Sequence, residues 1–593
     1  MFIPKYTDTS YMSTFQIHYK KESVIDLQYL ATQYDSVVET STPEYNPFRI
    51  HQIQNYNPIY SLFFELNESN YHKITLNQKY GIRGESLVDR ETGEAIDKAI
   101  FFKFSPLLDP VRYMVGKYDL TDPHLKTLPT NSNSGVCFPK IADTNNVSYI
   151  DSFFSYLASQ LLHTHNVFHS VDFYGSYLGI QEMFKTAITE DIEYLQSSPF
   201  FMQNLNRLFF VDSPVFAEYT KYGSKSNRNR IRVSKSSRAI SIGAEDLEEL
   251  PGSPDLTTEE TTEVVYEKQM GGSRASSADS DADSHSSQNS ADLNYSSSDE
   301  DEDEQLDMGD LDMGDEDEDI DSDGDSTRTP SEKTDEESEV YGFIKDYPTQ
   351  MICLEKCNGT LDELLLKDEI DDQNAASCLF QIVMTLLIYS KTFDLTHNDL
   401  HTNNIVYSDT EIEYIYYCYQ SKYYRVPTYG RIFKIIDFGR SIYRYQGKLF
   451  CSDSFAKYSD AHTQYNFPPY MNESKPRVDP NPSFDLCRLG CSIYDFVVDE
   501  MGEIETELQK TIARWCSDDN GKNVLYKRNG DERYPGFKLY KMISRNVHAH
   551  TPEAQLQYPY FSQFEISMKK LKKYDMAEIL ANGINIDAIP SYV

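Results

Sequence analysis

The sequence has few features of a secreted, zinc-stapled or membrane-spanning protein. Its nine cysteines are an odd number without the paired spacing of a structural zinc site. Cys353/Cys357 and Cys487/Cys491 are each four residues apart, but their apolar surroundings favour core packing over metal binding. No run approaches the roughly 18 apolar residues of a transmembrane helix, and the first residues show no signal-peptide or lipidation pattern. We therefore expect an intracellular protein in a reducing compartment, without a membrane partner.

Positive charge is also scarce compared with negative charge, and this imbalance lies mainly in one part of the chain. Of the formal net charge of −39, residues 241–340 carry −31, from 35 Asp and Glu against 4 Lys and Arg. Only two aromatic residues, Tyr266 and Tyr295, lie there, in a chain with 45 Tyr and 32 Phe. Such a segment cannot bury enough apolar surface to offset the entropy lost on ordering. We predict a disordered insertion over residues 213–340 and a mildly acidic folded part.

The first part of this predicted insertion is basic. Residues 221–238 contain seven Lys and Arg, which is compatible with a nuclear-import or nucleic-acid patch. Because almost no aromatic residues are interleaved to stack on bases, a solvated loop paired loosely with the acidic stretch is favoured. The acidic stretch itself is either a solubilising spacer or, at Ser296, Ser297 and Ser298, a substrate of an acid-directed kinase. The sequence gives no direct evidence for a nucleic-acid partner, and the nucleus is one location compatible with this charge pattern.

Hydrophobic patterning predicts an α+β protein. Alternating residues from Lys73 onward, interrupted by a Thr-Gly turn, indicate an antiparallel hairpin that contains Gly81 and Gly84 and leads into a strand over residues 99–104. An alternating, Tyr-rich stretch at 411–430 indicates a second hairpin. Three further stretches are predicted to be helices that contribute to the core: residues 147–166, 375–395 and 483–498.

Two polar motifs adjoin apolar strands. Residues 395–404 read LTHNDLHTNN, and residues 433–439 read FKIIDFG. An acid that orients a hydroxyl, with an amide and a second acid that hold divalent metal, is the set that phosphoryl transfer from ATP requires. Asp399, Asn404 and Asp437 are the candidates. The alternative for the two acids is a turn cap or a strand-end residue, which their attachment to apolar strands disfavours.

The order of these motifs resembles the eukaryotic-type protein kinase superfamily, and within it the putative serine/threonine kinases of giant DNA viruses. A strand lysine, a glycine-terminated strand and helix, HNDLHTNN, IIDFG and DLCRLG follow one another. The resemblance covers about residues 76 to 575 without the acidic block, and it implies a bilobal fold with a β-rich N-lobe and a helical C-lobe. The implied segments are an N-terminal extension (1–75), the first part of the N-lobe (76–212), the insertion (213–340), the end of the N-lobe with the hinge (341–358) and the C-lobe (359–593).

The resemblance also implies a role for each polar residue. Asp399 would orient the attacking hydroxyl, while Asn404 and Asp437 would hold magnesium. Lys103 would contact the phosphates of ATP as a point charge, with a protective edge-strand lysine as the alternative. The other implied residues are His397, which braces the loop; Asp485, a buried acid that holds the loop backbone; Glu355 and Cys357, which offer hinge backbone groups to ATP; and Gly81 and Gly84, in the phosphate-binding hairpin.

The glycine-rich loop and two residues beside the predicted catalytic acid depart from the family pattern. The glycine-rich loop is reduced to Gly81 and Gly84, which weakens the case for phosphate binding by backbone amides. Asn398 replaces the usual Arg before the catalytic acid, so we expect activity without phosphorylation of the activation segment. His401 stands where protein kinases mostly have Lys, and the resulting DLH is similar to haspin-type and small-molecule phosphotransferases.

Two acids of the family pattern are missing. The predicted helix at 147–166 contains no Glu, and its single acid, Asp151, is expected to cap the N-terminus. The acidic partner of Lys103 is therefore unassigned. No clear Ala-Pro-Glu ends the activation segment, and Glu473 is the nearest candidate for its acid.

Together these features predict an ATP- and magnesium-dependent protein kinase. The resemblance implies that it acts on Ser/Thr hydroxyls of proteins, and the acidic insertion is compatible with basic protein substrates. A small-molecule kinase is the enzymatic alternative. The non-enzymatic alternative is a pseudokinase that recruits basic partners through the acidic insertion. Such a scaffold needs none of the predicted catalytic residues. The resemblance implies host cytoplasm or virion as the location if the protein is viral.

Overall fold

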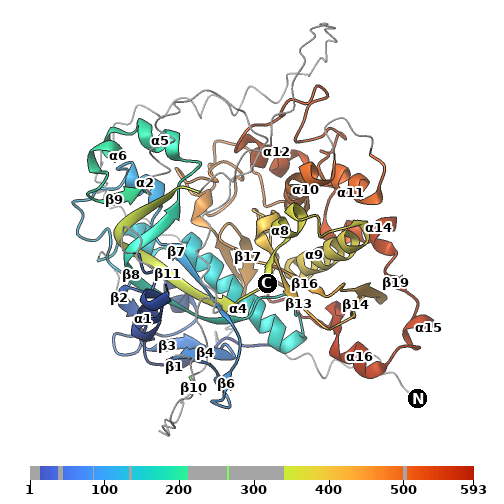
Figure 1. Ribbon diagram of the computed structural model, residues 1–593, viewed down its shortest axis with the longest axis horizontal. Helices are drawn as coiled ribbons and strands as arrows, with labels where there is room; N and C mark the ends of the chain where they lie inside the picture. Colours follow the sequence, from blue (N-terminus) through green and yellow to red (C-terminus); the bar gives the residue numbers. More distant parts are fainter. Residues whose placement is uncertain are drawn as a thin grey trace, which may run out of the picture. The chain divides into compact units, whose positions relative to one another are not determined.

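The described residues form a mixed α+β protein (Figure 1), which agrees with the predicted class. The chain divides into two compact units, Met1–Lys268 with Glu339–Val593, and Gln269–Ser338. The second unit, and nearly all of the predicted insertion over 213–340, lies outside the described residues. The computed structural model describes residues 14–37, 45–84, 86–131, 136–211, 264–265, 339–498 and 504–593.

Lys103 lies in a mainly antiparallel sheet built from distant parts of the chain. The order is β2 (Ile50–Gln54), β8 (Phe173–Ala187), β11 (Tyr341–Glu355) and β7 (Ile100–Pro106), and β9 (Phe209–Val211) also pairs with β11. The strand predicted over residues 99–104 is confirmed as β7. Lys103 stands opposite Ile352, so the lysine lies on the strand beside the one that leads to the predicted hinge.

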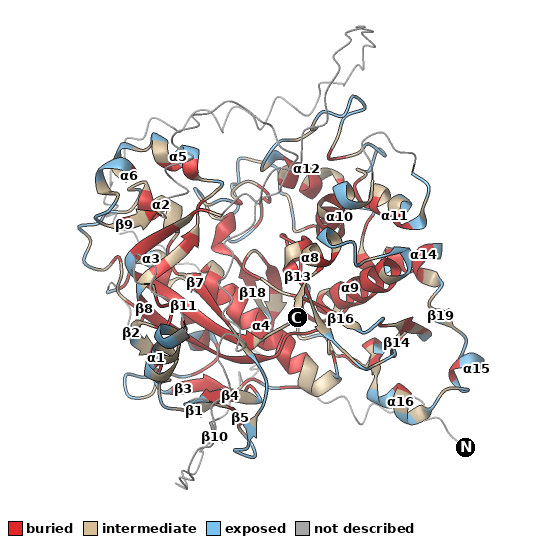
Figure 2. Ribbon diagram, in the orientation of Figure 1, coloured by how far each residue is buried: buried red, intermediate tan, exposed pale blue. Residues whose placement is uncertain are grey.

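Helix α4 (Val147–His165) confirms the helix predicted over residues 147–166 and is buried along most of its length (Figure 2). It contacts β8 of the sheet. The N-terminal extension also contacts it, because the Phe63 ring stacks on Phe153 with centroids 5.5 Å apart. Just after the extension, Asn77 Oδ1 accepts from the Tyr156 hydroxyl. The helix therefore lies between the sheet and the extension, which fixes its position.

Helix α9 (Asp372–Phe393) is the core of the C-terminal part, and Figure 1 shows it among α8, α11 and α14. It is long and apolar enough to cross a membrane, but 89% of its most apolar window is buried inside the protein, as expected for a core helix. Beside it, β13 (Ile405–Asp409) pairs antiparallel with β16 (Arg431–Ile435). The predicted Tyr-rich hairpin is confirmed as β14 (Tyr414–Tyr419) and β15 (Lys422–Pro427).

The remaining elements complete the described part. In the N-terminal half they are β1 (Tyr19–Lys21), α1 (Gln28–Val37), η2 (Pro58–Leu62), β3 (Ile74–Leu76), β4 (Tyr80–Arg83), β5 (Ser86–Asp89), β6 (Ala95–Ile96), α2 (Pro110–Met114), α3 (Pro139–Ala142), α5 (Ile192–Ser197), α6 (Pro199–Asn204) and β10 (Val264–Val265). In the C-terminal half they are β12 (Gly359–Thr360), α8 (Leu361–Leu366), η4 (Thr402–Asn404), β17 (Ile442–Tyr445), β18 (Lys448–Cys451), η5 (Asp453–Phe455), α10 (Phe484–Val497), α11 (Glu507–Trp515), α12 (Lys538–Asn546), α13 (Pro552–Gln555), α14 (Pro559–Ser562), β19 (Glu565–Ile566), α15 (Met568–Leu571), α16 (Met576–Ala581), β20 (Gly583–Asn585) and η6 (Ile586–Ala588).

Candidate active site

The two polar motifs lie side by side because the strands attached to them, β13 and β16, pair with each other. The Ile436 amide donates to the Asn404 carbonyl at 3.0 Å. The Asn404 side-chain amide in turn donates to the Asp399 carbonyl at 2.9 Å. Asp399, Asn404 and Asp437 are thereby brought to one site.

Asp485, from α10, holds the backbone of the loop that carries Asp399. The backbone amides of His397 and Asn398 donate to the two carboxylate oxygens of Asp485, each at 2.8 Å. Burial raises the pKa of Asp485, which the charge of His397 and these two hydrogen bonds oppose. His397 Nε2 also lies 3.0 Å from the Ile436 carbonyl oxygen, and its ring packs on Phe438. Asp485 and His397 thus fix the loop to its neighbours.

Lys103 has an acidic partner that the sequence left unassigned. Its Nζ lies 2.7 Å from Asp151 Oδ2 and 2.9 Å from Asp437 Oδ1. Burial acts to lower the pKa of Lys103, but the two carboxylates raise it above its ordinary value. The expectation that Asp151 caps its helix is wrong, because the Asn146 side chain is the cap and Asp151 points to the lysine. Asp151 Oδ1 also accepts from the Phe438 amide at 2.8 Å, so one acid joins the lysine to the second motif.

Asp399 is surrounded by positive charge. Burial acts to raise its pKa, but Arg440, whose Nη1 lies 3.8 Å from Asp399 Oδ1, lowers it below the ordinary value together with His401 and Arg488. Burial also lowers the pKa of His401 to about 4. His401 is then neutral near pH 7, so the two arginines are the groups that keep Asp399 ionised there.

Asn404 and Asp437 are suited to hold a divalent metal. The Asn404 side chain donates its amide to the Asp399 carbonyl, and its Oδ1 accepts no hydrogen bond from the described residues. Asp437 supplies a carboxylate beside it. Mg²⁺ is usually bound by one or two such protein oxygens, with phosphate and water oxygens completing its coordination. The described residues contain no cluster of three or more His, Cys, Asp or Glu that could hold a metal ion.

The predicted hinge residues differ in their contacts. Glu355 binds Lys434 Nζ with both carboxylate oxygens at 2.7 Å, and its backbone amide donates to the Asp172 carbonyl. Its side chain and amide are therefore used within the protein. Cys357 is half-buried and its thiol accepts from the Ser408 hydroxyl at 3.7 Å. Cys357 lies between β11 and β12. Its backbone N–H and C=O make no backbone hydrogen bond among the described residues, which leaves both groups able to contact a ligand.

The hairpin of Gly81 and Gly84 contacts β8 and the end of α4. The ring of Tyr80 lies edge-on to His163, near the end of α4. The guanidinium of Arg90 occupies the space where a Cβ on Gly81 would lie, and Gly84 has φ of +58° in the turn between β4 and β5. Close packing at Gly81 and a positive φ at Gly84 therefore explain why glycine stands at both positions. The phosphate-binding role of Gly81 and Gly84 stays a prediction.

The segment that follows the second motif is anchored to α4. Asp453 Oδ1 accepts from the Val147 amide at 3.0 Å, at the first turn of the helix, and Asp453 forms an ion pair with Lys140. Negative charge at a helix N-terminus is stabilising. Asp453 thus ties this segment to the helix that carries Asp151.

The side chain of Asn398 makes hydrogen bonds to uncharged groups. Its Oδ1 accepts from the Tyr465 hydroxyl at 2.7 Å, and its Nδ2 donates to the Arg440 carbonyl at 3.1 Å. Both partners belong to the segment after the second motif. Glu473 is exposed and makes no ion pair among the described residues, so it does not hold that segment as the sequence suggested.

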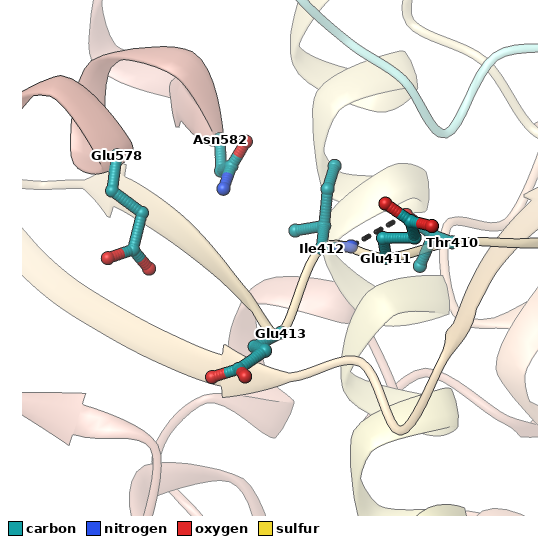
Figure 3. A pocket seen from close by; sticks show the side chains of 6 residues that line it. All are labelled: Thr410, Glu411, Ile412, Glu413, Glu578 and Asn582. Carbon is teal, nitrogen blue, oxygen red and sulfur yellow. Dashed lines mark hydrogen bonds between the residues drawn. The ribbon is translucent and has the colours of Figure 1, made fainter.

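A separate hollow of about 660 Å³ lies between the β13–β14 connection and α16 (Figure 3). It contains none of the predicted site residues. Three carboxylates contribute to its lining, and Figure 3 shows that they come from two distant parts of the chain. The lining residues are Thr410, Glu411, Ile412, Glu413, Glu578 and Asn582.

Four residues of the site were missed or misread in the sequence: Asp151, Arg440, Arg488 and Tyr540. Arg440 directly follows the FKIIDFG motif, so its proximity to Asp399 could have been expected. Tyr540 and Arg488 lie far along the chain and have no local signal. No protein-family model matches this chain, and no curated protein matches it.

Proposed function

We propose that this chain is an ATP- and magnesium-dependent kinase that transfers phosphoryl groups to Ser/Thr hydroxyls of proteins. The observation that carries the proposal is the junction of Lys103 with Asp151 and Asp437, beside the loop of Asp399 and Asn404. A lysine paired with a helix acid, and a metal-binding acid in place, are two requirements of kinase catalysis. The sheet with α4 would be the N-lobe of a bilobal kinase fold, and the elements from α8 onward the C-lobe.

Each side chain then has a task in the reaction. Asp399 orients the attacking hydroxyl and accepts its proton, and the ion pair with Asp151 places Lys103 to neutralise the phosphates of ATP. Asn404 and Asp437 would hold magnesium, whose charge stabilises the phosphate oxygens. Most of the rate enhancement comes from this positioning, because the protein forms no covalent bond to the phosphate.

A small-molecule kinase is the second candidate. His401 favours it, since this residue replaces the lysine of most protein kinases. The reduction of the glycine-rich loop to Gly81 and Gly84 also fits a phosphotransferase with a different phosphate clamp. A scaffold without activity is disfavoured, because it has no use for the buried ion pairs of Lys103 with Asp151 and Asp437, whose desolvation cost can exceed their Coulombic gain.

Label transfer from γ-labelled ATP distinguishes these functions. The full chain is incubated with Mg²⁺ or with EDTA and with casein, histone, sugar, aminoglycoside and lipid acceptors. We expect magnesium-dependent labelling of a protein. Labelling of a small molecule alone decides for the second candidate. Absence of transfer to every acceptor, with no rise in Tm on adding Mg²⁺ and ATP, contradicts both, and loss of binding to basic partners on deleting residues 241–340 then supports a scaffold.

Asp453 should make activation-segment phosphorylation unnecessary. Because a fixed carboxylate already links this segment to Lys140 and the first turn of α4, we expect phosphatase treatment to leave kcat unchanged. Asp453→Asn should lower kcat about tenfold, which corresponds to losing roughly 1.4 kcal/mol of helix positioning. The control is Asp479→Asn, an exposed acid paired only with Arg477. Inactivation by phosphatase, or full activity of Asp453→Asn, would contradict this account.

A further inference from the structure

The proposed catalytic acid is contacted by a residue from α12. The Tyr540 hydroxyl donates to Asp399 Oδ1 at 2.9 Å. The same hydroxyl oxygen accepts from Arg488 Nε at 3.0 Å. A guanidinium only donates hydrogen bonds, so the hydroxyl proton of Tyr540 has to point to Asp399. The direction of both hydrogen bonds is therefore determined.

Arg488 is an unusual residue to find at this depth. It is 0% exposed, and among the described residues its Nη1 and Nη2 have no hydrogen-bond partner. No carboxylate forms an ion pair with it in the described part of the chain. Burying an unpaired cation costs stability. Its charge acts on the Tyr540 hydroxyl, on the Tyr540 ring with its centroid 5.3 Å away, and on the Asp399 carboxylate.

The two oxygens of the Asp399 carboxylate are not equivalent. Oδ1 accepts from Tyr540 and lies 3.8 Å from Arg440 Nη1. Oδ2 accepts no hydrogen bond from the described residues. The carboxylate is 2% exposed and Tyr540 is 3% exposed, so little water competes for the bond between them. One oxygen is thus fixed by the protein and the other is available to a substrate hydroxyl.

We propose that Arg488 and Tyr540 form a relay that fixes the rotation of the Asp399 carboxylate and presents Oδ2 to the attacking hydroxyl. Tyr540 is then a positioning residue of the reaction, and the inference rests on the proposed function. A hydrogen bond to the ionised form also favours ionisation. The other charged or titratable groups that face Asp399 are His397 and His401 from its own loop, Arg440 from the second motif, and Asp485 from α10.

Tyr540→Phe tests the relay by removing one hydroxyl while keeping the ring. We expect kcat to fall about tenfold with KM for ATP unchanged, because the bond orients the acid proposed to face the attacking hydroxyl and does not involve Lys103, the residue proposed to bind the phosphates. Losing a donor to the charged form raises the pKa of Asp399, so the acid limb of the kcat profile should move to higher pH. The shift should persist in the His401→Gln background, where no histidine titrates at that position. Tyr560→Phe, a buried tyrosine bonded to the Asp372 carbonyl, should leave the limb in place.

A second measurement does not depend on activity. Asp399 titrates at low pH in the folded protein, so its hydrogen bond stabilises the fold above the unfolded pKa and the effect is lost on acidification. Tyr540→Phe should therefore lower Tm at pH 7 more in the wild type than in the Asp399→Asn variant. An equal decrease in both, or an unmoved acid limb in an active enzyme, overturns the relay. Absence of any phosphoryl transfer overturns the proposed function instead, and the Tm comparison still tests the relay.

Discussion

Replacing Asp399 by Asn is expected to lower kcat for phosphoryl transfer by about 10²- to 10⁴-fold while ATP still binds. The amide has the shape of the carboxylate and still accepts the Tyr540 hydrogen bond, but it cannot take a proton from the attacking hydroxyl. The loop is held through the backbone by Asp485, so the substitution should not move Asn404. Label transfer gives kcat, and calorimetric titration gives the Kd for ATP.

The matched control for this substitution is Asp409→Asn. Asp409 lies at the exposed end of β13, in the strand that follows the loop, and its replacement changes the net charge by the same amount. We expect it to retain wild-type kcat. Equal incorporation of label by the wild type and by Asp399→Asn would remove Asp399 from the reaction, and loss of ATP binding would show that the variant is misfolded.

The central part of the site could be predicted because short motifs determine it. Asp399 and Asn404 lie in one loop, Asp437 ends the neighbouring strand, and β13 and β16 have to pair for either strand to be buried. The spacing within each motif therefore sets which side chains meet. Asp485 followed from the family resemblance, and its two hydrogen bonds to the loop amides give that role a physical cause.

The rest of the site depends on tertiary contacts that no motif encodes. Asp151 looked like a cap because it lies near a helix N-terminus, but Asn146 takes that position and leaves the acid free to face Lys103. The guanidinium of Arg90 fills the space where a Cβ on Gly81 would lie, a packing reason for this glycine that the sequence did not show. Tyr540 reaches Asp399 across 141 residues of sequence, a distance over which local patterns carry no information.

Replacing Asp151 by Asn is expected to have the second largest effect. Lys103 would keep only Asp437 as a partner, and the acid meant for the metal would be drawn to the lysine. Misplacing a phosphate-binding group by about 1 Å can cost around 10²-fold, so kcat/KM for ATP should fall by roughly that factor. Removing one partner of a buried ion pair should also lower the free energy of unfolding by about 3 kcal/mol, which chemical denaturation measures.

A comparison with Asp151→Glu separates catalysis from stability. The longer acid keeps the charge but adds a methylene to a packed site, which costs about 1–3 kcal/mol. It should therefore recover most of kcat/KM for ATP while remaining less stable than the wild type. Glu182→Gln, at an exposed position of β8, controls for loss of a carboxylate. If Asp151→Asn lowered stability but left kcat/KM unchanged, the pair with Lys103 would be purely structural, and the phosphate-binding role of Lys103 would lose its main support.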